Sequence, residues 1–357
     1  MKIFFDARMI AHAGIGRYIR GILPEIAKDK SIELCLLGNR ILIEKFFDAQ
    51  NRVIDFNYPI YSIQEQIGFK KLKSTIGDNL LHVPHYNIPV FAPYNLVVTI
   101  HDLIHILYPQ GASSYFARFY MNFMIRKVLS MAKKVICVSG HTKEAICHNY
   151  HVAGTNLEVV GEGVDGSFSK ITDEGFLDAI KQKYHLPGKF ILYVGSIRKH
   201  KNITMLLEVF SKIRKEMPEV SLVLVGKLSQ SFDLKLDGVH YLGEVPDDKE
   251  LAAIYNLSSV FCNLSLFEGF GLTILEAQAC GVPIVCSDIA VHRETGGNGI
   301  LAVPPSNVDQ IAQALYNVLT KQTFQDILIK NGLENVQRFS WQKASERVVE
   351  LYRLVGG

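Results

Sequence analysis

The sequence of 357 residues lacks the features of a membrane-spanning or disulfide-bonded protein. It has no run of about 18 apolar residues, the length that a spanning helix requires. Its six cysteines form no CxxC pair and no cluster with histidine, so we predict neither a structural metal site nor a disulfide framework. The start, MKIFFDARMI, has a strand pattern that contains Asp6 and differs from a signal peptide. We therefore expect a cytoplasmic protein whose cysteines are reduced and buried.

Excess charge and internal repeats are also missing. The formal net charge is only +3, so the overall balance does not favour nucleic acid as a partner. No repeat or low-complexity tract interrupts the chain. This composition is typical of a globular protein of about two domains.

Short β-branched runs alternate with longer helical patterns, which is typical of parallel sheets with crossover helices. In the first half we predict strands at residues 2–6, 32–37, 79–83, 96–100, 134–139 and 157–160. A polar segment at 163–176 indicates a linker near residue 168. The pattern then restarts, with strands at 190–196, 221–226, 239–245, 260–265 and 283–288. We expect an α/β protein of two doubly wound, Rossmann-like domains, residues 1–168 and 169–339.

Two glutamates flank a glycine-rich turn between a predicted strand and a predicted helix. Glu268 falls in the turn and Glu276 about one turn inside the helix, so both can face one ligand. Carboxylates accept hydrogen bonds from sugar or ribose hydroxyls, and exposed turn amides bind phosphate. The turn and the helix start comprise Gly269, Phe270, Gly271 and Leu272. A capped helix with a buried glutamate is the structural alternative.

A basic turn follows the first predicted strand of the second domain. It begins at Gly195, ends at Asn202, and includes Arg198 and Lys201. Fixed positive charges and helix N-terminal amides stabilise a leaving nucleotide diphosphate. The GK[ST] ending of a Walker loop is missing. We predict a diphosphate site here, with a solvated basic turn as the alternative.

Two shorter signals lie at strand ends in the first domain. Gly14 and Gly16 fall in a predicted loop before a helix, where a ligand can approach the backbone; a tight turn for packing explains them equally well. His101 and Asp102 end a predicted strand, at the edge where doubly wound sheets bind ligands, although a lone histidine is more often structural. We place Arg17 and Asp102 on the acceptor or sugar side.

Taken in this order, the four segments resemble the group-1 (family 4) retaining glycosyltransferases with the GT-B fold. The resemblance covers essentially the whole chain and is nearest to bacterial mannosyl- and rhamnosyltransferases of surface polysaccharide assembly. It implies that two Rossmann-like domains face each other across a cleft, the first binding the acceptor and the second the nucleotide sugar. It also implies that the last helix, residues 340–357, crosses back to the first domain with Trp341 as its anchor.

The resemblance also implies roles for individual residues. The family's Glu-x7-Glu signature matches Glu268, expected at the donor sugar, and Glu276, expected at the nucleotide ribose. The family's phosphate-binding lysine falls on Lys201, and its donor-sugar histidine falls on His101. We predict His101, Lys201 and Glu268 as the catalytic residues. The predicted donor and nucleotide site comprises Gly14, Gly16, Gly195, Arg198, Lys201, Gly269, Phe270, Gly271, Leu272 and Glu276.

The chemistry that the resemblance implies is transfer with retention, in which a donor phosphate oxygen takes the acceptor's proton. No Asp-x-Asp motif occurs, which agrees with transfer without metal or cofactor and argues against the single-domain, metal-using glycosyltransferases. One departure is His200, where many members carry an arginine before the phosphate lysine. A histidine is only partly charged at neutral pH, so either Arg198 replaces the arginine or donor binding is weaker.

The donor and the acceptor are less closely defined. GDP-mannose is the first expectation, while UDP-glucose, UDP-N-acetylglucosamine and dTDP-rhamnose remain open. The expected acceptor is a glycan or a polyprenyl-diphosphate-linked oligosaccharide. Two other functions also remain open: a GT-B sugar nucleotide epimerase, which the Glu-x7-Glu pair disfavours, and a catalytically weak nucleotide-sugar-binding partner subunit, which His200 favours and the other matched residues disfavour.

A basic stretch without acidic residues lies between Asp102 and Glu144. Helical spacing over 113–134 places one set of residues on one face: Arg118, Asn122, Arg126 and Lys133. Roughly opposite lie Phe116, Phe119, Phe123 and Met131. We expect the aromatic side to pack on the sheet. The basic side is free to bind an anionic membrane surface, and we predict peripheral attachment to the inner face of the plasma membrane.

Overall fold

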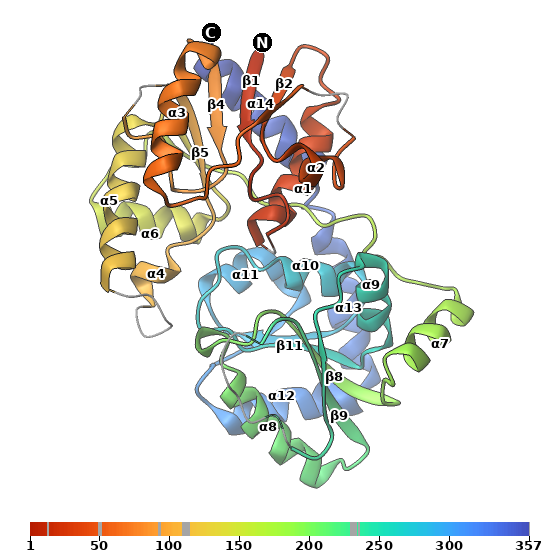
Figure 1. The fold of residues 1–357 in the computed structure, drawn as a ribbon. Coiled ribbons are helices and arrows are strands. Elements are labelled where there is room, and N and C mark those ends of the chain that lie inside the picture. The colour runs from red at the N-terminus through yellow and green to blue at the C-terminus, as the bar shows by residue number, and fades with distance from the viewer. Residues whose placement is uncertain are drawn as a thin grey trace. The chain divides into compact units, whose positions relative to one another are not determined.

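The computed structural model describes residues 1–12, 14–48, 52–91, 94–108, 115–228, 234 and 236–356. The chain forms two compact units (Figure 1). Unit 1 combines Met1–Gly163 with Ser340–Gly357, and unit 2 comprises Val164–Phe339. Each unit has a parallel sheet with reversed strand order, so the predicted α/β class with two doubly wound, Rossmann-like parts is confirmed.

In its described residues, unit 1 contains a seven-stranded parallel sheet of order β3-β2-β1-β4-β5-β6-β7. The strands are β1 (Lys2–Asp6), β2 (Glu33–Gly38), β3 (Arg52–Asp55), β4 (Leu80–Val83), β5 (Asn95–Ile100), β6 (Lys134–Cys137) and β7 (Leu157–Val159). Chain order reverses between β1 and β4, and ligands bind beyond the carboxyl ends of strands at such a switch point. The sequence did not predict β3, because a four-residue edge strand with charged ends shows too little periodicity.

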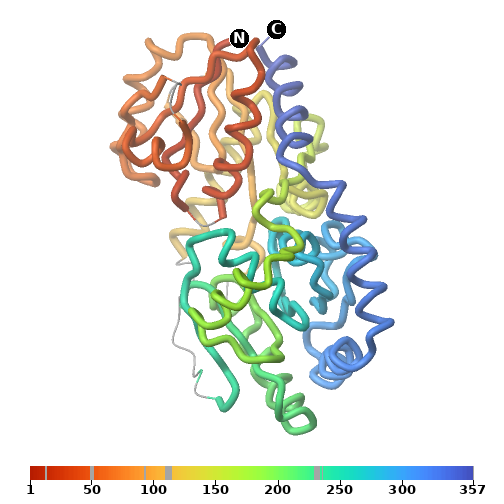
Figure 2. Tube along the Cα trace, turned by 90° about the vertical axis from the view of Figure 1, so that its right-hand side faces the viewer, coloured from red at the N-terminus to blue at the C-terminus, as the bar shows by residue number. Residues whose placement is uncertain are grey.

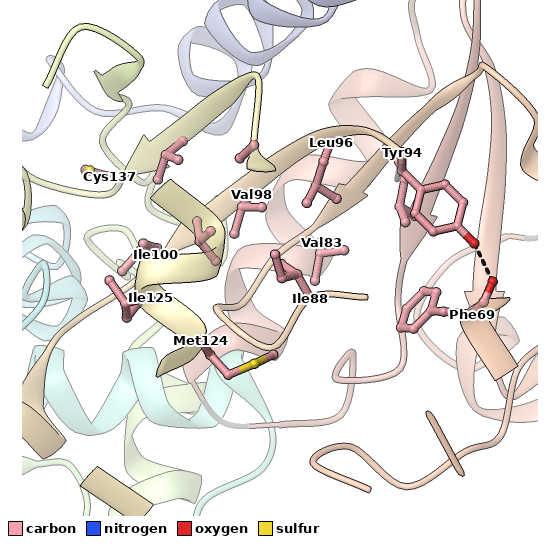
Figure 3. Packing of buried hydrophobic residues seen from close by; sticks show 14 of the residues in the cluster. Phe69, Val83, Ile88, Tyr94, Leu96, Val98, Ile100, Met124, Ile125 and Cys137 are labelled. Carbon is pink, nitrogen blue, oxygen red and sulfur yellow. Dashed lines mark hydrogen bonds between the residues drawn. The ribbon is translucent and has the colours of Figure 1, made fainter. Parts of the chain in front are cut away.

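Helices cover both faces of this sheet, because alternate strand residues on both sides are apolar. The helices of unit 1 are α1 (Gly14–Ile26), α2 (Arg40–Glu44), α3 (Ile63–Ile76), α4 (Ile104–Leu107), α5 (Tyr115–Met131), α6 (Gly140–Tyr150) and α14 (Trp341–Gly356). On one face, Val98 and Ile100 of β5 belong to the same core as Met124 and Ile125 of α5 (Figure 3). The opposite face packs against α1 and α14.

The last helix is an integral part of unit 1, where α14 lies beside α1 (Figure 2). Trp341 is only 8% exposed, and a β-carbon at Gly21 of α1 would lie 2.1 Å from its Cε2. Near the other end of α14, the hydroxyl of the buried Tyr352 lies 2.5 Å from Nδ1 of His82 on β4. Both ends of the helix therefore contribute to the core.

The aromatic rings of α5 are exposed, so the expectation that this side packs on the sheet is wrong for them, although Met131 of the same predicted side does pack against the core. The residues that the helix buries are Met121, Met124, Ile125 and Val128. The ring-bearing residues Phe116, Phe119 and Phe123 are 82%, 70% and 44% exposed. The prediction divided the helix into a basic face and an aromatic face. It overlooked a third face, the aliphatic one formed by these four buried residues, which packs against apolar side chains of the sheet. Ser113 and Ser114, at the start of the predicted helix, lie outside the described residues.

Unit 2 contains, in its described residues, a six-stranded parallel sheet of order β10-β9-β8-β11-β12-β13, with the switch point between β8 and β11. The strands are β8 (Lys189–Val194), β9 (Val220–Val225), β10 (Val239–Gly243), β11 (Val260–Asn263), β12 (Ile284–Ser287) and β13 (Leu301–Val303). The helices are α7 (Glu174–Lys183), α8 (Ile203–Glu216), α9 (Asp248–Leu257), α10 (Leu272–Ala279), α11 (Ala290–Gly296), α12 (Val308–Thr320) and α13 (Gln322–Val336), with 3-10 turns η2 (Lys199–Lys201) and η3 (Gly297–Gly299). The sequence did not predict β13, a short run that Pro304 directly ends.

Candidate active site

In unit 2 the two predicted donor segments follow β8 and β11, the strands on either side of the switch point. The basic turn leads from Gly195 through η2 to α8, and the glutamate-containing turn leads from Asn263 to α10. The backbone N–H of Leu266 donates a hydrogen bond of 2.8 Å to the carbonyl of His200. This bond holds the two loops side by side, although they are more than sixty residues apart in the sequence.

Lys201 and Glu268 form a short ion pair between these loops. The Nζ atom of Lys201 lies 2.6 and 2.7 Å from the two carboxylate oxygens, and Ser265 Oγ donates to the same carboxylate at 2.7 Å. Burial alone raises the pKa of Glu268, but the charges of Lys201 and His292 and the hydrogen bonds from Lys201 and Ser265 lower it to about 2. The carboxylate is therefore charged at neutral pH, and it contacts the same ammonium group that is predicted to bind the donor phosphate.

Glu276 lies one turn inside α10 and is only 3% exposed. Tyr255 of α9 donates its hydroxyl hydrogen to Oε2 of Glu276 at 3.0 Å. Gly271, with φ of 93°, precedes the helix in a conformation that favours glycine and brings no side-chain cap. The Tyr255 hydroxyl therefore holds the carboxylate of Glu276 in place inside the first turns of α10.

Several other predicted donor residues have structural contacts. Phe270 is buried, and its ring packs edge-on against Phe339 with centroids 5.8 Å apart, so only its backbone is left for a ligand. A β-carbon at Gly226 would lie 2.1 Å from the carbonyl oxygen of Gly195, so β8 and β9 approach closely just beyond their ends. His200, at the position where many members of the resembled family carry an arginine, is buried in the turn, whereas Arg198 is exposed to solvent.

In unit 1, His101 follows β5 and is held by two oxygen atoms. Its Nδ1 lies 3.1 Å from a carboxylate oxygen of Glu162, and its Nε2 lies 3.2 Å from the carbonyl oxygen of Pro84. These two contacts, one to each ring nitrogen, fix the orientation of the imidazole. Sequence reasoning missed Glu162, which is 4% exposed, because it lies beside the polar linker. Its place just beyond the last strand of the sheet was the available signal.

The remaining predicted residues of unit 1 start helices. Asp102 accepts a hydrogen bond of 2.9 Å from the backbone N–H of Ile104, the first residue of α4. Gly14 and Gly16 form the first turn of α1, together with Arg17, and not a loop before the helix, which corrects their predicted position.

The two glycines of this turn differ in their packing. A β-carbon at Gly16 would lie 2.5 Å from the carbonyl oxygen of Ile10, so close packing explains this glycine. A β-carbon at Gly14 would meet no atom within 4 Å. Packing therefore accounts for Gly16 but not for Gly14.

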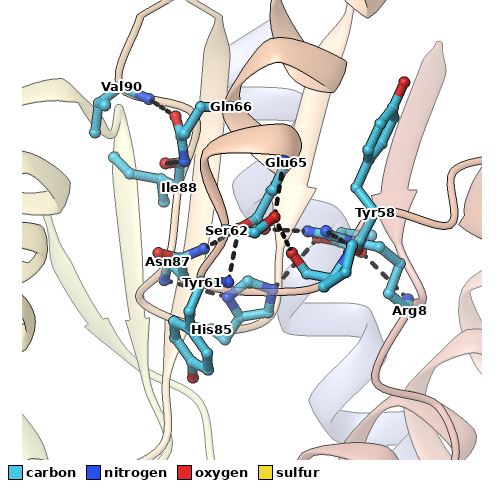
Figure 4. Close-up of polar contacts among 12 residues, drawn as sticks. Arg8, Tyr58, Tyr61, Ser62, Glu65, Gln66, His85, Asn87, Ile88 and Val90 are labelled. Carbon is cyan, nitrogen blue, oxygen red and sulfur yellow. Dashed lines mark hydrogen bonds and ion pairs between the residues drawn. The ribbon is translucent and has the colours of Figure 1, made fainter. Parts of the chain in front are cut away.

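A buried network of charged side chains lies at the switch point of unit 1, and sequence reasoning missed it (Figure 4). Arg8 donates to Asp6 at 2.5 Å and to Glu65 of α3 at 2.6 Å, and His85 Nε2 lies 3.3 Å from Asp6. Burial raises the pKa of Asp6, but Arg8 and His85 outweigh it and hold the pKa well below its usual range. An aspartate at the end of the first strand was the available signal. In the part of the chain that the structure describes, no group of three or more His, Cys, Asp or Glu side chains could hold a metal ion.

Comparisons with known proteins identify relatives of both units. The family model for glycosyl transferases group 1 matches residues 176–335, and the model for Glycosyltransferase Family 4 matches residues 52–168. The O-antigen chain mannosyltransferase B of Escherichia coli is 25% identical over 99% of this chain and 100% of its own length. The serotype-specific mannosyltransferase WbdA of the same species is 28% identical over 75% of this chain, but over only 35% of its own length.

The fold is shared with solved structures. The Anabaena protein HepE, in complex with UDP-glucose, matches 99% of this chain and 99% of its own with a TM-score of 0.78 at 18% identity. At this identity the likeness shows the fold alone.

Proposed function

Because the chain belongs to the group-1 glycosyltransferases with the GT-B fold, we propose that it transfers mannose from GDP-mannose to a glycan or a lipid-linked oligosaccharide. The observation that carries the proposal is the Lys201–Glu268 pair at the switch point of unit 2, where the two donor loops meet. The names of the relatives support mannose as the transferred sugar.

In this proposal the donor diphosphate binds Lys201, Arg198 and the first amides of α10. Glu268 already holds the Lys201 ammonium at 2.6 Å, so the positive charge is in place before the diphosphate arrives. As the phosphate draws this ammonium away, the carboxylate becomes able to accept a hydrogen bond from a sugar hydroxyl. Glu276, held by Tyr255, accepts from the ribose hydroxyls. Retention of configuration and independence from a metal ion are part of the proposal, since fixed cationic side chains stabilise the leaving group.

Calorimetric titration with GDP, UDP and dTDP, with and without a chelator, tests the donor site. We expect one nucleotide to bind regardless of chelator, and Glu276→Gln to weaken its binding about tenfold or more, because hydrogen bonds to charged groups contribute about 1.5–3 kcal/mol. Glu334→Gln, at an exposed position on α13, is the matched control and should bind like the wild type. Binding by no nucleotide, or equal binding by both variants, would contradict the site. The anomeric configuration of the product, read by NMR, tests retention.

We further propose that the exposed side of α5 attaches the protein to anionic lipid, where a lipid-linked acceptor resides. Among the described residues, no helix is long and apolar enough to cross a membrane. Instead Phe116 and Phe119 project from α5, and Lys127 Nζ lies 5.6 Å from the ring centroid of the exposed Phe123. Aromatic rings beside cationic groups suit the interface of an anionic bilayer.

Flotation with liposomes tests this attachment. Vesicles with phosphatidylglycerol should carry the wild type upward at low salt, and Phe116→Ser with Phe119→Ser should abolish this. Tyr316→Ser, which removes a partly exposed aromatic ring of unit 2, should leave flotation unchanged. If the α5 variant floats as well as the wild type, or if the wild type does not float, α5 is not the membrane-binding surface.

A further inference from the structure

A pocket of about 410 Å³ lies in unit 1 beyond the carboxyl ends of β1, β2 and β3. Its volume falls in the range of about 300–1,000 Å³ that small-ligand pockets occupy. The lining residues come from the segments that directly follow these strands. They are four apolar residues together with Arg8, His12, Asn39, Asn57, Tyr58 and Tyr61. None of these residues is among those that the sequence predicted for the site.

The lining combines aromatic and aliphatic side chains with amide, imidazole and guanidinium groups. Tyr61 is 49% exposed, and Asn57 and His12 are also exposed, so these side chains are accessible to a ligand. A pyranose ring has a C–H face that packs on an aromatic ring and a rim of hydroxyls that bond to amides and imidazoles. The chemistry of the pocket therefore suits a sugar better than a purely apolar or a highly charged ligand.

The position of Tyr61 is fixed by the buried charged network (Figure 4). Its φ angle of 69° is in the left-handed region, which is unfavourable for a tyrosine. The backbone N–H of Tyr61 donates to Glu65 at 2.9 Å, and Glu65 in turn accepts from Arg8 at 2.6 Å and from Asn87 at 2.5 Å. Burying charges is costly unless they are paired. This network thus holds one strained, half-exposed tyrosine at the rim of the pocket.

The pocket and His101 lie at the same edge of the sheet of unit 1, beyond the carboxyl ends of its parallel strands. The ring of Tyr61 lies 5.8 Å from that of Tyr86 and 6.2 Å from that of Tyr120. Tyr86 follows β4, the strand between β1 and β5 in the sheet, and His101 follows β5. Asp102 adjoins His101, the residue predicted to lie beside the donor sugar. All of these groups belong to unit 1.

We propose that this pocket binds the terminal sugar of the acceptor glycan, with Tyr61 as the ring on which the pyranose packs and Asn57 as a hydrogen-bonding partner. The inference rests on the proposed function, because it names the acceptor site of that transfer. Glu65 and Arg8 act as positioning residues that hold Tyr61 at the rim.

Two measurements on the full chain test the pocket, with an α-linked mannotriose as the probe. Saturation-transfer NMR should detect its binding to the wild type in the presence of GDP, which occupies the donor site without transferring a sugar. With GDP-mannose as donor, Tyr61→Ala should raise the KM for mannotriose about tenfold, with a smaller change in kcat and unchanged affinity for GDP. Tyr61→Phe, which keeps the ring, should stay near the wild type, and so should the control Tyr316→Ala in unit 2.

Asn57→Ala provides a second variant at an exposed position, and we expect a rise in KM of several-fold. If the wild type transfers mannose but neither variant changes KM, this inference is wrong while the proposed function stands. If the wild type neither binds GDP nor transfers mannose, yet mannotriose signals disappear in Tyr61→Ala, the proposed function fails and the pocket remains a saccharide site. Absence of mannotriose signals from the wild type would overturn the inference.

Discussion

Glu268 links the charge of the donor loops to the stability of the fold. Its pKa is about 2 in the folded protein, against an ordinary value of 4.5. The contribution of ionised Glu268 to the free energy of unfolding is therefore fully present above pH 4.5 and is lost as the pH falls toward 2. In urea unfolding, Glu268→Gln should reduce the loss of stability between pH 7 and pH 3 by about 2 kcal/mol. Glu334→Gln should keep the wild-type loss, and an unchanged pH dependence in Glu268→Gln would show that the pair is not formed.

The sequence located candidate residues better than it located their partners. Lys201 and Glu268 were both singled out, but their direct pairing depends on β8 and β11 being neighbours in the sheet. Glu162 reaches His101 across 61 residues, and Glu65 reaches Arg8 across 57. Spacing along a strand or helix predicts only local neighbours, so contacts that depend on strand order were missed.

At the scale of elements, the contact between α1 and α14 has little tolerance for added volume. Gly21→Ala should lower the midpoint of thermal unfolding by roughly 4–8 °C, because its β-carbon overlaps Trp341 and overpacking costs about 1–3 kcal/mol. Trp341 is the single tryptophan of the chain, so its fluorescence reports this contact directly. Gly14→Ala, in the same helix with open space at its β-carbon, should leave the midpoint unchanged or slightly raised. Equal midpoints for both variants would contradict this packing.

Most strands could be predicted from the sequence, whereas two edge strands and the buried face of one helix could not. The sequence predicted strands that overlap β1, β2 and β4 to β12, because buried parallel strands form distinct apolar runs. The edge strands β3 and β13 were missed, because β3 has charged residues at both ends and the apolar run of β13 ends at Pro304. In α5, the apolar content was recognised but the buried face was assigned to the wrong residues, since aromatic rings and aliphatic side chains share one helix.

At the scale of the whole molecule, the two units differ in how the chain builds them. Unit 2 is one continuous segment, Val164–Phe339, and it contains Lys201, Glu268 and Glu276. Unit 1 needs two segments that are far apart in the sequence, because α14 completes its core. The ends of these segments adjoin, since a β-carbon at Gly163 would lie 2.2 Å from the backbone nitrogen of Trp341.

This difference predicts how fragments of the chain will behave. Residues 164–339 alone should fold, because this unit has its own hydrophobic core. They should bind the same nucleotide as the whole protein, because Lys201, Glu268 and Glu276 all belong to this unit. Residues 1–163 alone should not fold cooperatively, since they lack the buried Trp341 and Tyr352 of α14. Circular dichroism and calorimetry of each fragment measure both expectations.

Joining residues 340–356 to Gly163 through a short glycine–serine linker should restore cooperative folding of unit 1, because the two chain ends already adjoin. The same fusion with Trp341→Ser is the matched control and should fold poorly, since it loses the ring that packs on Gly21. A cooperative transition of residues 1–163 alone, at the same temperature as the fusion, would contradict the role of α14. It would mean that the sheet of unit 1 is stable without α14, which packs beside α1 on one of its faces.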